Sequence, residues 1–376
     1  MIKILFVIPE YSHGGTNKSL ENLLSLLDKD KYDISIYSLY EDGGDYYKEV
    51  FKPYIIKKSS LYYWLHDNVV TRKFMGLFNK ITRRDNFTWL YRREANLIQN
   101  KHKYDTIVAY QEGPATQFVS YVKNVKQKIA WIHCDYNDWS DEKQRKKDES
   151  VYFSFKNIVC VSETARQSFC KVFPQYKDKS ISVYNTLNCE KIINMSFKEV
   201  SLPAKNGKRF SIISVGRLSE VKQFDKIPSI VKSMGNEIAN KICWYIIGAG
   251  SQKEYIEKEI RLYHLEDTVI MLGAKDNPYP YFKSADLYVC TSDSESFSYT
   301  IFESKILHTP VLSNNFPVAY EVLDKNCGWV YSLDEMPALI ADLINDKDGI
   351  YYKVKKSIED YEYDNKRIIK QIDAIL

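Results

Sequence analysis

The sequence alternates between short apolar runs and segments in which leucine or isoleucine recurs at helical spacing. Ile2–Ile8 is almost continuously apolar and rich in β-branched residues, which is typical of a parallel strand covered on both faces. Four leucines then follow at the i, i+3, i+4, i+7 spacing of an amphipathic helix: Leu20, Leu23, Leu24 and Leu27. A strand followed by a helix is the repeating unit of an α/β fold.

The alternation continues through the first half of the chain. Apolar runs predict further strands at Tyr32–Leu39, Asp105–Tyr110, Lys128–His133, Asn157–Val161 and Ser180–Tyr184. Helical patterns between them include Phe87–Asn100 and Glu163–Val172. This order predicts a doubly wound parallel sheet with helices on its faces.

A second alternation begins after a break. Asn188–Lys208 loses the rhythm, contains Pro203 and Gly207, and is interpreted as an interdomain linker. Strands are then predicted at Phe210–Val215, Ile242–Ile247, Thr268–Leu272, Asp286–Cys290 and Pro310–Ser313, with helices at Phe224–Met234 and Gln252–Tyr263. We therefore expect two α/β domains, 1–195 and 206–352, with a cleft between them and a charged helix at about 355–376 after the second.

Composition agrees with two globular domains of ordinary size, since the chain has 376 residues and is 44% hydrophobic. A net charge of +4 is mild for this length and does not indicate a nucleic-acid-binding surface. The seven cysteines lie far apart without zinc-ligand spacing, as in a reducing cytosol. The run Ile2–Ile8 is too short for a signal peptide, and no apolar stretch is long enough to span a bilayer, so we expect a cytoplasmic protein.

The segment Lys52–Arg93 departs from this even composition. It carries ten lysines and arginines against two acids, interleaved with tyrosine, tryptophan and phenylalanine. Basic and aromatic residues together favour peripheral contact with an anionic membrane or a phosphorylated lipid acceptor. The alternative is a solvated basic face on helices whose aromatic residues pack inward.

The chemistry-bearing residues gather in Thr291–Lys305, which reads TSDSESFSYTIFESK. This stretch follows the predicted strand Asp286–Cys290 and runs into a helix-like pattern at Tyr299–Leu307. Glu295 therefore lies in a loop at the carboxyl end of a strand, and Glu303 about one turn into the next helix. Ligands of open α/β sheets bind at these strand ends, so the stretch is a candidate nucleotide-sugar site.

Several motifs in this order resemble the retaining GT-B glycosyltransferases of family 4. They are SVGRLSEVKQFD at Ser214–Asp225, IIGAG at Ile246–Gly250, NPYPY at Asn277–Tyr281, SADL at Ser284–Leu287, and the E-x7-E pair Glu295 and Glu303. In the first half, Gly14-Gly15 and Trp131-Ile132-His133 match weaker family signals. The resemblance implies a GT-B fold of two Rossmann-like domains, with the C-terminal helix crossing back to the first.

The activity implied is transfer of a sugar from a nucleotide-diphosphate donor, most commonly a UDP-sugar, with retention of anomeric configuration. The acceptor would be a glycan or a polyprenyl-diphosphate-linked saccharide in bacterial capsule or other surface-polysaccharide synthesis. A sugar-nucleotide 2-epimerase of the same fold and a non-catalytic nucleotide-sugar-binding subunit are the alternatives.

Arg217 and Lys222 are the predicted diphosphate ligands. Both follow a buried strand, and one offers a forked guanidinium while the other offers a point charge. Negative charge grows on the diphosphate as the glycosidic bond breaks, so cations placed there stabilise the transition state. They would also neutralise the leaving group without a metal, and no suitable DxD pair occurs, so we expect neither metal nor cofactor.

The loop residues are assigned roles by the resemblance. Glu303 would accept hydrogen bonds from the two ribose hydroxyls, and Glu295 would face the donor sugar. Backbone amides of Phe297, Ser298 and Tyr299 would reach the sugar and phosphates, and Thr300 would add a hydroxyl or an amide. Ser296 and Ser298 stand where the commoner family pattern has glycines, which leaves the identity of the donor sugar open.

The first domain supplies the remaining candidates. Gly14 and Gly15 follow a strand and open a helix, where backbone amides can approach a phosphate, or they form only a tight turn. By resemblance His133, at a strand end, would contact the reacting sugar; the alternative is a hydrogen-bonded core histidine. His13, Glu112 and Asp135 are weaker candidates at neighbouring strand ends.

Overall fold

A computed structural model describes residues 1–376 except 68–69, 72, 75–76, 78–85, 201 and 203–208. The chain divides into two compact units. The first comprises Met1–Leu187 and Asn365–Leu376, and the second comprises Asn188–Asp364. Each unit has a parallel sheet with helices, so the α/β, doubly wound fold class predicted from the sequence is confirmed.

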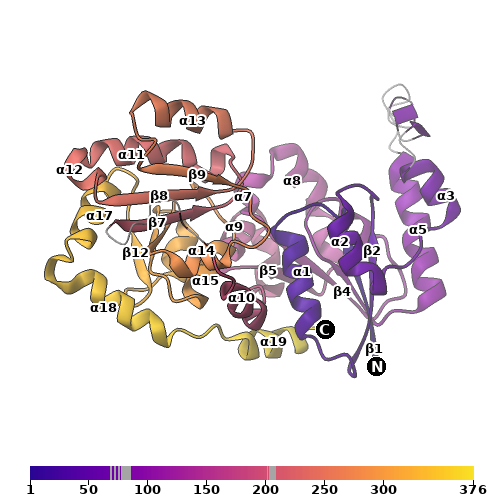
Figure 1. Ribbon diagram of the computed structural model, residues 1–376. Helices are drawn as coiled ribbons and strands as arrows, with labels where there is room; N and C mark the ends of the chain where they lie inside the picture. The colour runs from indigo at the N-terminus through magenta and orange to yellow at the C-terminus, as the bar shows by residue number, and fades with distance from the viewer. Residues whose placement is uncertain (68–69, 72, 75–76, 78–85, 201, 203–208) are drawn as a thin grey trace. The chain divides into compact units, whose positions relative to one another are not determined.

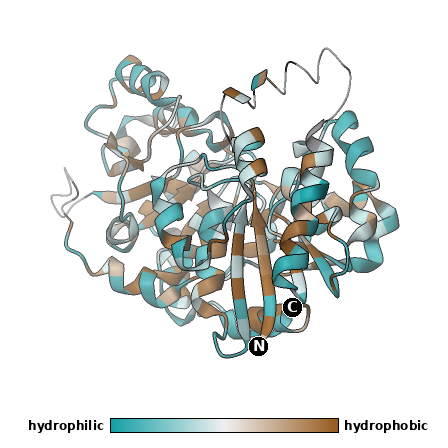
Figure 2. Ribbon diagram, turned by 90° about the vertical axis from the view of Figure 1, so that its right-hand side faces the viewer, coloured by the Kyte–Doolittle hydropathy of each residue, from teal (hydrophilic) through white to brown (hydrophobic). Residues whose placement is uncertain are grey.

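The first unit has a six-stranded parallel sheet in the order β2-β1-β3-β4-β5-β6. Its strands are β1 (Ile2–Ile8), β2 (Tyr32–Ser38), β3 (Thr106–Ala109), β4 (Gln127–Ile132), β5 (Asn157–Cys160) and β6 (Ser180–Ser182). Its helices are α1 (Gly15–Leu26), α2 (Asp45–Phe51), α3 (Ser60–Tyr62), α5 (Asn86–His102), α6 (Pro114–Ser120), α7 (Tyr136–Trp139), α8 (Glu142–Glu149), α9 (Glu163–Val172) and α19 (Asn365–Asp373). The apolar residues of the central strands are almost completely buried, and hydrophobic colour concentrates on the strands in Figure 2.

The second unit repeats the plan, with strand order β12-β11-β10-β7-β8-β9. Its strands are β7 (Phe210–Val215), β8 (Ile242–Ile247), β9 (Val269–Gly273), β10 (Leu287–Cys290), β11 (Val311–Ser313) and β12 (Gly328–Val330). Its helices are α10 (Cys189–Ser196), α11 (Ile227–Ser233), α12 (Gly235–Ala239), α13 (Lys253–Leu262), α14 (Tyr279–Ser284), α15 (Tyr299–Ile306), α16 (Pro317–Val322), α17 (Met336–Ile344) and α18 (Ile350–Ser357). Helices α11 and α13 cover one face of β7–β9, and α14 and α15 lie on the other (Figure 1).

Each strand order contains one point at which successive connections run in opposite directions. In the first unit it lies between β1 and β3, and in the second between β7 and β10. The loops that leave these neighbouring strands diverge onto opposite faces of the sheet. A crevice therefore opens at the carboxyl ends, and this is where open α/β sheets bind ligands.

The expected linker is not a linker throughout. Its first part forms α10, which packs on α14 and belongs to the second unit, so the domain boundary lies after Leu187 rather than at 195. The Asn188 side chain caps this helix by accepting from the Lys191 amide, and Ile192 is buried. Asn277 of the α14 segment donates to the Met195 carbonyl at 2.8 Å. One buried apolar position in eight residues is too weak a periodicity to reveal such a helix in the sequence.

The expected single C-terminal helix is two helices. After α18 the chain passes through a short 3-10 turn at Ile358–Asp360 and resumes as α19. Val354 and Ile358 are buried in the second unit, whereas Ile368 and Ile372 are buried in the first. The two apolar faces serve different cores, which explains why the helix is interrupted and why only 365–376 completes the first unit.

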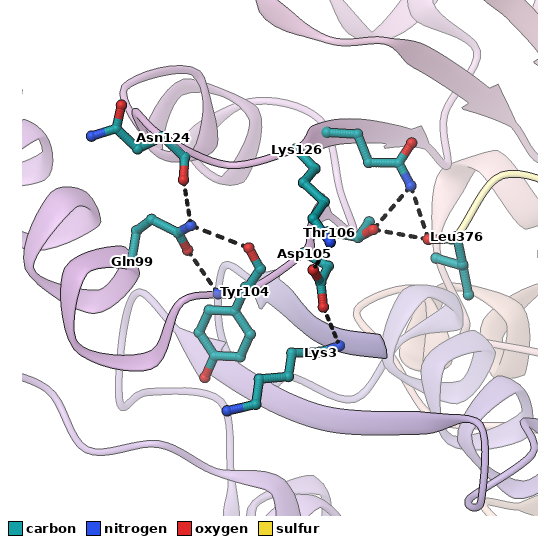
Figure 3. A network of polar contacts seen from close by, with 9 residues as sticks. Lys3, Gln99, Tyr104, Asp105, Thr106, Asn124, Lys126 and Leu376 are labelled. Atoms are coloured by element: carbon teal, nitrogen blue, oxygen red, sulfur yellow. Dashed lines mark hydrogen bonds and ion pairs between the residues drawn. The ribbon is translucent and has the colours of Figure 1, made fainter. Parts of the chain in front are cut away.

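Hydrogen bonds fasten the C-terminal segment to the first unit. Thr106 Oγ1 donates to the Leu376 carbonyl at 2.9 Å, and Gln127 Nε2 donates to the same carbonyl at 2.9 Å (Figure 3). At the other end of the segment, the Asn365 side chain accepts from the Leu187 amide at 3.1 Å and donates to the Leu187 carbonyl at 2.7 Å. The second unit interrupts the first between Leu187 and Asn365, and the Asn365 side chain joins these two residues directly.

Candidate functional site

The turns after β7 and β10 meet at the switch point of the second unit. Thr291 Oγ1, just beyond β10, donates to the Lys222 carbonyl at 2.7 Å. The Asp293 amide donates to the Val221 carbonyl at 2.8 Å. These bonds join two predicted motifs that are about seventy residues apart in the sequence.

Lys222 and Glu295 form an ion pair across these two turns. Their side chains are 22% and 15% exposed, so the charges are largely withdrawn from water but still reachable. Burial is the largest influence on the pKa of Lys222 and lowers it, but the Glu295 carboxylate and Cys290 together raise it, so its pKa lies above the ordinary value. The structure therefore brings together one predicted diphosphate ligand and the predicted sugar ligand.

Two buried polar residues orient the Glu295 carboxylate through hydrogen bonds. Ser292 Oγ donates to Glu295 Oε1 at 2.9 Å, and Asn314 Nδ2 donates to the Ser292 carbonyl at 3.0 Å. Ser292 is 1% exposed and Asn314 is 7% exposed. Neither residue was predicted from the sequence as part of the site. The polar side chain of Asn314 directly after a buried strand was the available signal.

The glycine motif after β8 supports the turn that carries Arg217. The Leu218 amide donates to the Ala249 carbonyl at 2.9 Å. A Cβ added at Gly248 would lie 1.9 Å from the Gly216 carbonyl oxygen, and one at Gly250 would lie 2.2 Å from that of Leu218. These glycines therefore permit two backbones to touch, and they position the cationic turn.

Arg217 is exposed on this turn. Its charge acts on Lys222, since the guanidinium is one of the groups that lower the Lys222 pKa. Arg217 thus places a further cation beside the Lys222–Glu295 ion pair, and its forked guanidinium suits a diphosphate.

The start of α15 has an unusual backbone. Ser298 precedes the helix with φ 60° and ψ 71°, a left-handed conformation that costs a residue with a Cβ about 1–2 kcal/mol. Among the described residues its buried hydroxyl has no hydrogen-bond partner. The glycine in the commoner family pattern thus corresponds to a position with positive φ, which the sequence alone could not show.

The other residues of this loop lie in packed surroundings. Phe297 is 4% exposed and stacks on Phe302 with ring centroids 4.7 Å apart, so its ring is packed inside the protein. The Phe297 ring also contacts that of Tyr299 edge to face. Thr300 Oγ1 accepts from the Tyr288 hydroxyl at 2.6 Å.

Glu303 lies on α15 and is 2% exposed. It accepts a hydrogen bond from the Tyr279 hydroxyl at 3.1 Å. Tyr279 is the first tyrosine of the NPYPY motif, so that motif fixes one carboxylate oxygen of Glu303. Sequence reasoning did not connect the two.

In the first unit, Gly14 and Gly15 lie at the switch point after β1. Gly14 is exposed, and a Cβ added there would meet nothing within 4 Å. Asn17 holds the preceding loop by donating to the carbonyls of Glu10 and Ser12 at 3.0 and 2.8 Å. Gly15 begins α1, so open backbone amides are present where a phosphate was expected.

His133 follows β4 in the same unit. Its imidazole is buried although the residue retains some exposure, and burial lowers its pKa to about 3. Within the described part of the chain, Nε2 has no hydrogen-bond partner. The ring packs against Tyr110 with centroids 5.0 Å apart, so it is neutral at physiological pH with one polar atom unused.

Glu112 follows β3 and accepts from the His133 amide at 2.8 Å. It is 4% exposed, and burial raises its pKa. Asp135, by contrast, caps α7 by accepting from the Asn137 and Asp138 amides. Its position is explained by that helix start.

His13 is exposed and stacks on Tyr46 with ring centroids 5.6 Å apart. Among the described residues no group of three or more histidine, cysteine, aspartate or glutamate side chains has metal-binding geometry.

The basic-aromatic segment divides into two faces. Tyr62 and Tyr91 are buried with the His66 imidazole in an aromatic cluster. Trp64 and Trp89 are each 56% exposed. Some aromatic rings of the segment therefore pack inward and others face outward, and membrane contact stays a prediction. Several of its predicted residues lie outside the described ones: Arg72, Phe78, Lys80, Arg83, Arg84 and Asp85.

Within the described ranges, no helix is both long and apolar enough to cross a membrane.

Comparison with protein families gives one match, over residues 198–362, to the family "Glycosyl transferases group 1". These residues include β7 to β12 and the Lys222–Glu295 pair.

Curated relatives cover most of the chain. The O-antigen biosynthesis glycosyltransferase WclY of Escherichia coli is 22% identical over 340 residues, which are 87% of this chain and 84% of that protein. The amylovoran biosynthesis glycosyltransferase AmsD of Erwinia amylovora is 22% identical over 348 residues, 91% of this chain and 89% of the relative.

Solved structures share the fold along the whole chain. The crystal structure of Anabaena Alr3699/HepE in complex with UDP matches with a TM-score of 0.75 at 15% identity. The match covers 100% of this chain and 99% of the HepE chain. The lipopolysaccharide outer core galactosyltransferase WaaB has a TM-score of 0.68 at 14% identity, with coverage of 100% and 99%. The architecture is GT-B, as expected.

Proposed function

Starting from a glycosyltransferase of GT-B fold with a group 1 domain, we propose that the chain transfers a sugar from a nucleotide-diphosphate donor, with a UDP-sugar as donor. The contact between Lys222 and Glu295 at the switch point of the second unit carries this proposal. In this contact a cation suited to a diphosphate lies beside a carboxylate suited to sugar hydroxyls. The structural relative Anabaena Alr3699/HepE has been solved in complex with UDP and in complex with UDP-glucose. These complexes support uracil as the base of the donor.

We assign the donor-binding roles to Gly14, Gly15, Arg217, Lys222, Phe297, Ser298, Tyr299, Thr300 and Glu303, and the catalytic roles to Glu295 and His133. Neutral His133 suits contact with sugar hydroxyls, because a neutral imidazole can donate or accept a hydrogen bond. Transfer retains the anomeric configuration, as in family 4 enzymes.

The acceptor is a glycan or a lipid-linked saccharide of bacterial surface-polysaccharide synthesis. The O-antigen and amylovoran relatives support this class. The first unit would bind the acceptor, and the second unit, which contains the group 1 domain, would bind the donor.

The decisive experiment incubates the protein with a panel of UDP- and GDP-sugars and measures released nucleotide. We expect release from one UDP-sugar, rising with a lipid-linked acceptor, and a product whose anomeric configuration matches the donor by NMR. Turnover of the donor to an epimer without acceptor would instead identify an epimerase. Binding without any turnover would identify a non-catalytic subunit, and neither binding nor release would refute the proposal.

Transfer should not need a divalent metal, because Arg217 and Lys222 supply positive charge where the diphosphate leaves. Treatment with EDTA should therefore leave the rate within about twofold of its original value. Loss of transfer that Mn²⁺ restores would show that a metal shares this role.

The enzyme would work at the inner face of the cell membrane through the outward face of 52–93. Tyr63 and Trp64 follow directly after α3, and Trp89, Arg92 and Arg93 lie on α5; all five are exposed. Amphipathic aromatic rings and cations together suit an anionic lipid interface.

Sedimentation with vesicles tests this contact. The protein should bind vesicles containing phosphatidylglycerol but not pure phosphatidylcholine. The double variant Trp64→Ala/Trp89→Ala should bind several-fold less than the chain with Phe153→Ala, which removes an aromatic ring 80% exposed elsewhere in the first unit. Equal binding by the two variants would exclude this surface.

A further inference from the structure

Lys222 and Glu295 have separate ligands under the proposed function, yet they bind each other in the structure. The first is assigned to the donor diphosphate and the second to the donor sugar. A carboxylate and a phosphate oxygen are both anionic acceptors for an ammonium group. Glu295 is therefore bonded to the same ammonium group for which a diphosphate oxygen is an alternative acceptor.

We propose that Glu295 is an internal competitor of the diphosphate, so that donor binding moves Lys222 from Glu295 to the phosphate while Ser292 keeps Glu295 in place. This exchange rests on the proposed nucleotide-sugar function, and it adds Ser292 as a positioning residue.

The geometry makes Lys222 the partner that moves. Its backbone is held by Thr291, but the ammonium group lies at the end of a flexible four-carbon chain. Glu295 has a shorter side chain and a second bond, from Ser292 Oγ at 2.9 Å. Ser292 is in turn fixed through its carbonyl by Asn314. When the ammonium group leaves, the carboxylate remains oriented.

The bound diphosphate supplies Lys222 with a new counter-ion in such an exchange. A partly buried charge without a counter-ion is unfavourable, so in the empty site the pair satisfies both groups. The neighbouring Arg217 repels Lys222 and would favour its transfer to an added anion. A bound diphosphate provides that anion and replaces Glu295 as the partner.

The exchange has a consequence for sugar transfer. The bond between the anomeric carbon and the phosphate oxygen breaks with its electron pair on the diphosphate, and the acceptor oxygen bonds to the same carbon. The acceptor proton passes to a diphosphate oxygen. Lys222 then faces increasing negative charge, while Glu295, released from its counter-ion, faces the positive charge that develops on the sugar.

Calorimetric titration of the full chain with UDP alone, and with GDP alone, tests the exchange. Glu295→Gln removes the competing charge and should tighten nucleotide binding on the order of tenfold, or about 1.4 kcal/mol. Lys222→Met should weaken it. In the double variant Glu295→Gln/Lys222→Met, the tightening should disappear because no ammonium group is left to release.

Three results would overturn the exchange. One is unchanged or weaker binding by Glu295→Gln while Lys222→Met also weakens binding. Another is equal tightening in the Lys222→Met background, which would mean general repulsion of the nucleotide by Glu295. In both cases nucleotide binding, and thus the proposed function, would stand. Failure of the wild-type chain to bind either nucleotide would remove the proposed function itself, and with it the exchange.

Ser292 is tested separately as a positioning residue. Ser292→Ala should reduce kcat while nucleotide affinity stays within about twofold of wild type, because the affinity depends on Lys222. Ser292→Thr keeps the hydroxyl and should recover a large part of kcat. Loss of both kcat and nucleotide affinity in Ser292→Ala, with no recovery by threonine, would assign Ser292 a purely structural role.

Discussion

His133 shows how burial can set the charge of one residue. Its folded pKa of about 3 lies below the ordinary value of about 6.5. In the pH range between these values the unfolded chain binds a proton that the folded chain does not. The free energy of unfolding is therefore not reduced by His133 above about pH 6.5. It decreases as the pH falls from 6.5 toward 3, because protonation of the histidine stabilises only the unfolded chain in that range.

Replacing His133 by Gln should remove this pH dependence. At pH 5 the wild-type histidine destabilises the fold by about 2 kcal/mol relative to pH 7.5. Urea unfolding at the two pH values should show a correspondingly smaller change for His133→Gln. Glu112, whose raised pKa acts in the opposite direction, is present in both proteins and cancels from the comparison. An equal change in both proteins would mean that the imidazole is protonated in the folded state.

Ser298 combines a left-handed backbone with a buried hydroxyl that lacks a partner in the described structure. Ser298→Gly should therefore stabilise the protein by about 1 kcal/mol, after allowing for the greater freedom of glycine in the unfolded chain. Ser296→Gly is the matched control, since Ser296 is not among the residues with positive φ. It should destabilise the protein by about 0.5–1 kcal/mol. Thermal melts of the two variants moving in the same direction would contradict this account.

At the scale of elements, the turn after β8 and the turn after β7 depend on close backbone contact. Gly248→Ala would force a Cβ to within 1.9 Å of the Gly216 carbonyl, and backbone cannot yield as a flexible side chain can. We expect a loss of about 3 kcal/mol or more, because overpacking against main chain has no local relief. Urea unfolding of the wild type and of Gly248→Ala measures this difference in the free energy of unfolding.

Gly14→Ala provides the contrast. The added methyl group meets nothing, and Gly14 has extended backbone at the start of α1, so stability should change by less than about 1 kcal/mol. Transfer activity should fall nonetheless if the donor phosphates approach this backbone. Full activity in Gly14→Ala would remove Gly14 from the donor site.

The sequence predicted the helices and strands better than it predicted which strands and side chains contact one another. Long apolar runs such as that of β8 were found because burial on both faces leaves a continuous hydrophobic pattern. β12 was missed, since three residues at a sheet edge carry almost no pattern. The pairing of Lys222 with Glu295 was not predicted either, because it depends on β10 lying beside β7, and strand order is not written in local periodicity.

At the scale of the whole molecule, Asn365 holds together a unit made from two chain segments. Asn365→Ala would leave the Leu187 amide and carbonyl without this partner and should destabilise the first unit by about 1–3 kcal/mol. Hydrogen exchange should show faster opening of α19. Asn326→Ala, at an exposed site in the second unit, is the control and should leave α19 protection unchanged.

The same amide contact has a use in protein engineering. Leu187 and Asn365 are hydrogen-bonded neighbours although the entire second unit lies between them in sequence. Topologically the second unit is an insert, and its removal would leave two ends already close enough for a short linker. A chain of 1–187 joined to 365–376 should therefore fold as an independent Rossmann-like domain.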